Sequence, residues 1–267
     1  QALDPDLVAR ATDILLPYVR PERVERIEHV LKQRTQHVRF LFENPVNPSN
    51  VWACLRTLDA FGIQHVDVVM QSGMYQGKAA LSQKRGMRTA MGAAQWLSLR
   101  NHASTDDAIR WLKQHGYQIW VSDLTDRSKD IRQVEWKATC NRGDTNDHDD
   151  NEDAEDRPIC IVMGNEERGI SDEMCAAADG SFFLPMVGFA ESFNLSVATA
   201  ITAAHLSAAS SSSSSSCQGP IRPGDLSEHE YNCLRLKGLL NSVAQKRMAF
   251  ALLKQEGIEL PDAMKFV

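Results

Sequence analysis

The first segment whose residue types suggest chemistry holds an Asn and an Arg six positions apart, Asn50 and Arg56. They bracket the predicted start of a helix that follows a turn rich in Pro and Asn. Six residues span about 1.7 helical turns, so the side chains do not stack, but both can converge on a ligand at the helix start. The structural alternative is that Asn50 or Ser49 caps the helix and Arg56 forms an ion pair.

A second segment places two glycines directly after an apolar strand pattern. Gly164 and Gly169 follow residues 159–163 with the glycine spacing of a phosphate-binding loop. The Lys-Ser/Thr pair that completes such a loop is absent, and Glu166 and Glu167 would repel a triphosphate. The loop therefore favours a neutral or cationic ligand, or a ribose, over ATP. A plain strand-to-helix turn is the structural alternative.

A third segment, residues 184–198, carries polar side chains into a helix. An apolar strand ends in Pro-Met, the chain passes through Gly188, and a helix is predicted to start at Ser192. Ser192, Asn194 and Ser196 can point at a ligand or can simply cap that helix.

These segments belong to a chain in which short apolar runs alternate with helical patterns. Such alternation predicts an α/β fold with a mainly parallel sheet flanked by helices. Each of the three segments begins where a predicted strand ends, and open α/β sheets bind ligands at the carboxyl ends of their strands. The predicted strands are residues 38–42, 66–70, 96–99, 119–122, 159–163 and 182–184, and the predicted helices are residues 50–61 and 105–115, with further helices starting at 171 and 192.

In this order, the three segments resemble the signature motifs of the SpoU branch of the SPOUT methyltransferases. The resemblance covers residues 25–206. Residues 25–36 and 119–136 look most like the tRNA guanosine 2′-O-methyltransferases that act on the D-loop. The matching residues are Asn50 and Arg56-Thr57 of an Asn-x5-Arg-Thr motif, Gly164, Glu166 and Gly169 of a Gly-x-Glu-x-x-Gly motif, and residues 184–198 of a Pro-Met-x-Gly-x3-Ser-x-Asn-x-Ser-x-Ala motif.

The resemblance implies a trefoil knot at the carboxyl end of the domain and a homodimer with each active site at the subunit interface. It also implies methyl transfer from S-adenosylmethionine to a ribose 2′-hydroxyl of tRNA, without a metal. Arg56 matches the catalytic Arg of the family, as a general base or as an electrostatic stabiliser of the developing alkoxide. The implied positioning residues are Asn50, Glu166, Ser192 and Asn194, and the implied cofactor contacts are Leu124, Gly164, Met186 and Leu195.

The charge distribution is uneven although the net charge is only −6. Residues 144–156 contain eight acidic residues and no Lys or Arg, whereas residues 68–105 contain no acidic residue. We expect the basic side chains of the latter stretch to meet RNA, above all Lys84, Arg85 and Arg88, unless they are ordinary solvated cations. Lys78 and Arg100 belong to the same stretch.

The chain divides into a central domain with additions at both ends. We expect an N-terminal helical extension over residues 1–36, a knotted domain over 37–209 and a C-terminal helical extension over 226–267. The polar, acidic composition of residues 140–157 predicts a disordered insertion. The serine run within residues 210–225 predicts a flexible linker.

The six cysteines show no CxxC pairing and no zinc-ligand spacing, so we expect no metal site and a reducing, intracellular compartment. That compartment is the cytoplasm, or an organelle if a targeting segment was removed. No apolar run is long enough for a membrane span.

Three other functions remain open at this point. One is a ribosomal-RNA 2′-O-methyltransferase, and another is a catalytically silent RNA-binding protein of the same fold. The third, a generic Rossmann-like enzyme, is disfavoured because no GxGxxG follows the first strand.

Overall fold

The computed structural model describes residues 3–70, 92–136, 157–211, 219–244 and 246–260. The chain forms two compact units, one of residues Thr35–Arg222 and one of Gln1–Arg34 with Pro223–Val267. Residues 140–156 of the predicted acidic insertion and residues 212–218 of the predicted Ser-rich linker lie outside the described residues. The first two residues of that predicted linker, 210 and 211, are instead the last turn of a helix.

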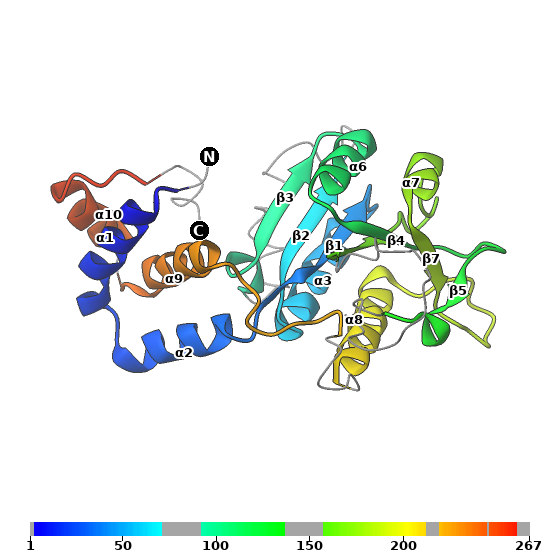
Figure 1. The fold of residues 1–267 in the computed structure, drawn as a ribbon, viewed down its shortest axis with the longest axis horizontal. Coiled ribbons are helices and arrows are strands. Elements are labelled where there is room, and N and C mark those ends of the chain that lie inside the picture. The colour runs from blue at the N-terminus through cyan, green and yellow to red at the C-terminus, as the bar shows by residue number, and fades with distance from the viewer. Residues whose placement is uncertain (1–2, 71–91, 137–156, 212–218, 245, 261–267) are drawn as a thin grey trace, which may run out of the picture. The chain divides into compact units, whose positions relative to one another are not determined.

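The larger unit is a seven-stranded sheet with helices on both faces (Figure 1). The strand order is β3-β2-β1-β6-β4-β7-β5, and every strand pair described in it is parallel. This confirms the predicted α/β fold with a parallel sheet. Its elements are β1 (Thr35–Glu43), α3 (Pro48–Ala60), β2 (Ile63–Val69), the 3-10 helix η3 (Ala93–Gln95), β3 (Ser98–His102), α6 (Thr105–Gln114), β4 (Gln118–Ser122), β5 (Lys129–Asp130), the 3-10 helix η4 (Ile131–Gln133), β6 (Ile159–Met163), α7 (Asp172–Ala177), β7 (Gly180–Phe183) and α8 (Leu195–Ser211).

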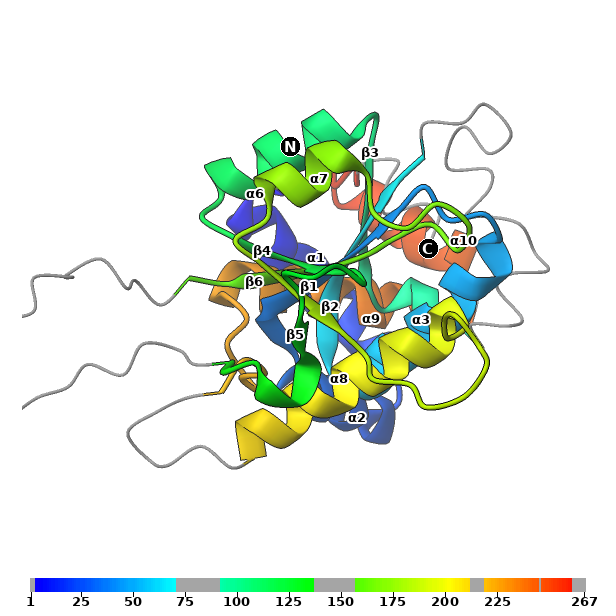
Figure 2. The same ribbon diagram turned by 90° about the vertical axis from the view of Figure 1, so that its right-hand side faces the viewer.

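Two hydrophobic cores hold the helices on the sheet. On one face α3 and α8 pack against alternate residues of β1 and β2 such as Phe40, Phe42 and Val66. On the other face α6 and α7 cover Leu41 and Val162 (Figure 2). Because both faces are covered, the central strands β1 and β6 are buried almost throughout, as parallel strands generally are.

The smaller unit is helical and has its own apolar core. It comprises α1 (Pro5–Leu15), α2 (Pro21–Leu31), α9 (Glu228–Ser242) and α10 (Lys246–Gln255). Asp4 caps α1, and prolines at the first turns of α1 and α2 fit the missing backbone donor there. Gly238 lets α2 and α9 approach closely, since a Cβ there would lie 2.9 Å from the Ile27 side chain.

Several predicted boundaries are wrong by a few residues. The strand expected at 96–99 is β3 at Ser98–His102, an edge strand whose exposed polar residues hide it from an apolar pattern. The helix expected from Ser192 begins at Leu195. Asn47 caps α3 by accepting from the Ser49 backbone, so neither Ser49 nor Asn50 is the cap.

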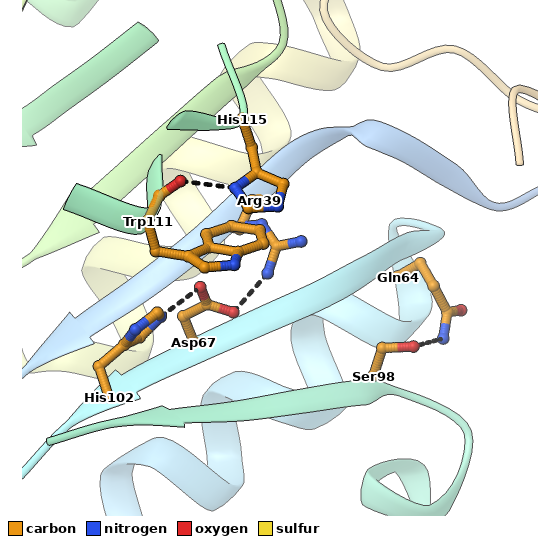
Figure 3. Close-up of polar contacts among 7 residues, drawn as sticks. All are labelled: Arg39, Gln64, Asp67, Ser98, His102, Trp111 and His115. Carbon is orange, nitrogen blue, oxygen red and sulfur yellow. Dashed lines mark hydrogen bonds and ion pairs between the residues drawn. The ribbon is translucent and has the colours of Figure 1, made fainter. Parts of the chain in front are cut away.

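The face of the sheet under α6 also carries a buried polar cluster (Figure 3). Asp67 on β2 is fully buried and contacts the guanidinium of Arg39 on β1. Its other oxygen lies 2.9 Å from Nε2 of His102 on β3. Trp111 of α6 covers this group, with its ring centroid 4.7 Å from the Arg39 guanidinium carbon. The cluster links three neighbouring strands through an ion pair and a hydrogen bond.

Four cysteines among the described residues are free. Burial raises the pKa of the Cys54 thiol to about 12 and that of Cys175 to about 11. Burial likewise raises the pKa of Cys160. These thiols are therefore protonated and unreactive near neutral pH. No helix among the described residues is long and apolar enough to cross a bilayer.

The Asp67→Asn substitution tests the buried cluster. It leaves the Arg39 guanidinium buried without an anion, so we expect the free energy of unfolding to fall by about 3–5 kcal/mol. Urea denaturation measures it. The matched control is Asp107→Asn, which breaks the exposed Asp107–Arg110 pair and should cost less than about 1 kcal/mol. Equal losses in the two variants would contradict a structural role for the cluster.

Candidate active site

The three motif segments meet at one edge of the sheet. Their strands, β1, β6 and β7, are parallel and end at Glu43, Met163 and Phe183. β1 lies next to β6, which brings the segment after β1 against the loop after β6. The strand order therefore brings together two segments that lie more than a hundred residues apart in the sequence.

Glu166 joins the first two segments directly. Its Oε1 accepts a 2.8 Å hydrogen bond from Nδ2 of Asn50, and its Oε2 accepts one of 2.8 Å from the backbone N–H of Val46. Hydrogen bonds to a carboxylate are stronger than those between neutral groups. The Glu166 side chain is therefore fixed by both of its oxygens.

The third segment joins through a chain of amides. The Asn50 Nδ2 faces Glu166, so its Oδ1 accepts from Nδ2 of Asn194 at 3.3 Å. The Oδ1 of Asn194 accepts from both the backbone N–H and the hydroxyl of Ser196, at 2.9 and 2.6 Å. Because a carboxylate only accepts, Glu166 sets the direction of this chain as far as the start of α8.

A second set of hydrogen bonds, centred on Glu43 and Asn165, holds the same loops. The buried carboxylate of Glu43 accepts from the Thr105 hydroxyl at 2.6 Å, and from the Ser171 backbone and hydroxyl at 3.0 and 2.6 Å. Asn165 donates to the carbonyl of Asn44, whose φ of 46° is unusual for a residue other than Gly. The motif-based prediction missed Glu43, although an acidic residue ending an apolar strand was a visible signal.

A cavity of about 340 Å³ opens beside this network. It is lined by all four predicted cofactor contacts, and by Glu166 and Ser192. Asn50, Arg56 and Asn194 are not among its lining residues. The four contacts are Leu124, Gly164, Met186 and Leu195.

The loop from Gly164 to Gly169, which lines this cavity, leaves no room for a side chain at Gly164. A Cβ on Gly164 would lie 2.5 Å from the carbonyl carbon of Gly169, closer than non-bonded atoms approach. The close approach arises because Asn165 and Gly169 exchange two backbone hydrogen bonds of 2.9 Å. Gly169 has a φ of 73°, which suits Gly.

The lining of the cavity suits a cation with an apolar body. Asp123, Glu166 and Glu191 contribute carboxylates, and none of the described lining residues is Lys, Arg or His. Met163, Phe183 and other apolar side chains supply the remaining walls. S-adenosylmethionine, a sulfonium with a flat adenine, has this chemistry, so the residues present fit it.

Arg56 stands apart from these contacts. It lies on α3 and is exposed, and its side chain makes no hydrogen bond or ion pair with another described residue. Its guanidinium donors are therefore available to a ligand. The predicted RNA contacts Lys84, Arg85 and Arg88 fall outside the described part of the chain. Among the described residues, no cluster of His, Cys, Asp or Glu has the arrangement of a metal site.

The fold and the cavity define an α/β protein with a cavity at the carboxyl edge of a parallel sheet. Residues 37–204 match the model of the SpoU rRNA Methylase family, and the chain belongs to this family. It is 31% identical over 179 residues to the tRNA (guanosine(18)-2′-O)-methyltransferase of Thermus thermophilus, covering 67% of this chain and 78% of that one.

Solved structures share the fold. The TrmH/SpoU tRNA modifying enzyme of A. aeolicus superposes with a TM-score of 0.65 at 24% identity, over 84% of this chain and 98% of that one. An AdoMet-bound rRNA methyltransferase from Sinorhizobium meliloti gives a TM-score of 0.50 at 24% identity, over 67% and 58% of the two chains.

Substituting Gly164 by Ala tests the close packing of the loop. The added methyl group must displace the Gly169 backbone, so we expect a loss of stability of about 1–3 kcal/mol and weaker binding of S-adenosylmethionine. Gly188→Ala is the matched control, because a Cβ there meets nothing within 4 Å. Thermal unfolding and isothermal titration calorimetry measure the two effects. Similar behaviour of both variants would show that the approach at Gly164 is unimportant.

Proposed function

We propose that this protein is an S-adenosylmethionine-dependent tRNA ribose 2′-O-methyltransferase that acts on a D-loop guanosine. The observation that carries the proposal is the Glu166–Asn50–Asn194 network beside a cavity whose described lining is acidic and apolar. The name of the T. thermophilus relative, which specifies guanosine 18 of tRNA, supports the substrate.

The cofactor would be held by Leu124, Gly164, Met186 and Leu195. When bound, S-adenosylmethionine supplies a methyl group activated by the positive charge on its sulfur. The carboxylates of Asp123 and Glu191 favour that charge, and the loop from Gly164 to Gly169 presents backbone groups at close range. No step in this binding requires a metal.

Arg56 would act on the RNA. A guanidinium is a permanent cation, so it makes a poor base but a good donor to phosphate and to a developing alkoxide. Because Arg56 is exposed and its side chain has no partner among the described residues, it can bind the phosphate next to the target ribose. We therefore favour electrostatic stabilisation over general-base catalysis for this residue.

Asn50, Glu166, Ser192 and Asn194 would position the reacting groups. Glu166 uses both oxygens to hold Val46 and Asn50, so its contribution is the placement of the α3 start. Ser192 lines the cavity and can contact the ribose. Placement of this kind lowers the barrier because the reactants need no further ordering.

A homodimer and a trefoil knot complete the proposal. Val187 and Phe189 are fully exposed in the segment after β7, and Leu124 at the cavity is 70% exposed. Exposed apolar side chains close to a site favour burial against another protein surface. A second copy of the chain would provide that surface. The knot would be formed by this same segment and α8, in line with the family to which the chain belongs.

We further propose the domain limits given above, with helical extensions over residues 1–36 and 226–267 around a knotted domain. The smaller compact unit, which joins the two ends of the chain, supports this division. The free thiols among the described cysteines support a reducing, intracellular compartment.

Methyl transfer from labelled S-adenosylmethionine to unmodified bulk tRNA tests the function. We expect modification at a D-loop guanosine, and a loss of about 100- to 1,000-fold in kcat for Arg56→Ala, since one charge-stabilising donor is removed. Arg110→Ala, in which an exposed Arg already paired with Asp107 is lost, should keep its kcat. Transfer to ribosomal RNA alone would overturn the substrate, and transfer to neither RNA would favour a silent RNA-binding protein.

Glu43→Gln tests the hydrogen bonds that the Glu43 carboxylate accepts from Thr105 and Ser171. The amide cannot accept all three hydrogen bonds, so we expect Ser171 and the loop before it to shift and kcat to fall about 10- to 100-fold. The affinity for tRNA should change little, which separates misplacement from general unfolding. Glu167→Gln, an exposed change in the same loop, is the control. A wild-type kcat in Glu43→Gln would remove Glu43 from the positioning network.

A further inference from the structure

Arg100 is an exposed cation whose guanidinium lies over an aromatic ring. It lies on β3, the edge strand of the sheet, in register with Asp67 of β2. Its guanidinium carbon is 3.9 Å from the centroid of the Trp111 ring on α6. A cation–π contact of this kind restrains a guanidinium, and its N–H donors can still bind a ligand.

Trp111 is itself held in place, which makes it a rigid support. The ring of His115 stacks on it at 3.9 Å, and Nδ1 of His115 lies 2.8 Å from the Trp111 carbonyl oxygen (Figure 3). The ring of Tyr117 lies 5.9 Å away. An Arg side chain ordered in advance loses less conformational entropy when it binds a ligand than a free one does.

The charge of Arg100 is not neutralised within the described part of the chain. No carboxylate of the described residues forms an ion pair or hydrogen bond with it. The nearby Asp67 already uses one oxygen for Arg39 and the other for His102. Two other exposed cations of this unit are paired, Arg110 with Asp107 and Arg132 with Asp130.

The position of Arg100 relates it to the candidate active site. β3 ends at His102, two residues further on, at the same edge of the parallel sheet where β1 and β6 end. The sequence from residue 68 to 105 contains no acidic residue, so Arg100 has no carboxylate neighbour along the chain. An RNA bound at the cavity extends well beyond one nucleotide and can reach this side of the sheet.

We propose that Arg100, supported by Trp111, binds a backbone phosphate of the RNA substrate. A planar guanidinium with two free N–H donors matches the paired oxygens of a phosphate. The contact is independent of sequence and adds to affinity rather than to the chemical step. This inference rests on the proposed function, which supplies the RNA.

Binding of unmodified tRNA to the full-length protein, titrated at several salt concentrations, tests the contact. We expect Arg100→Gln to weaken binding about 3- to 10-fold and to reduce the slope of log K against log [salt] by about 1. Arg100→Lys should keep the slope but bind more weakly, because it retains the charge and loses the planar stack. Arg110→Gln, on the same helix as Trp111, should bind as the wild type does.

Wild-type affinity and slope in Arg100→Gln would overturn the phosphate contact, whatever the activity of the protein. The kcat at saturating tRNA should be unchanged in this variant, and a large fall in kcat without a change in affinity would also overturn it. Failure of the proposed function looks different. In that case the wild type methylates no tRNA, while the loss of slope in Arg100→Gln still shows the phosphate contact.

Discussion

The carboxylate of Glu166 is the interaction on which the candidate site depends. A parallel sheet brings the loops after β1 and β6 near each other, but it does not fix their side chains. Glu166 does so, because each of its oxygens accepts a hydrogen bond from the segment after β1. Since it can only accept, it also determines which way the amides of Asn50 and Asn194 point. One charged group thereby orders three separate segments.

The same sheet carries a second charged group whose role differs. Asp67 is buried under α6 with Arg39 and His102. It joins β1, β2 and β3, and it forms no ion pair with Arg100 at the edge, which among the described residues contacts the Trp111 ring instead. A buried pair of this kind seldom adds net stability compared with apolar packing. Here it links three strands and lies in register with the exposed Arg100.

Prediction from the sequence succeeded where a pattern is local. The alternation of apolar runs and helices predicted the parallel α/β sheet, and the three motifs predicted the family. Prediction failed where solvent exposure or hydrogen bonding determines the element or the contact. Edge strand β3 is too polar for an apolar pattern, and Asn47, not Asn50, caps α3 because the helix begins at Pro48 and Asn50 lies inside its first turn. Glu43 went unnoticed because its partners, Thr105 and Ser171, are distant in sequence.

By itself, then, the sequence determined the type of fold and the family, since motif spacing and apolar periodicity are properties of the chain. Tertiary structure decided which of those residues touch. It leaves Arg56, exposed on α3, outside the Glu166–Asn50–Asn194 chain, and it places the Arg100 guanidinium over the Trp111 ring. The physical reason is that hydrogen bonds and stacking act over a few ångströms, and only the strand order brings residues far apart in the sequence within that range.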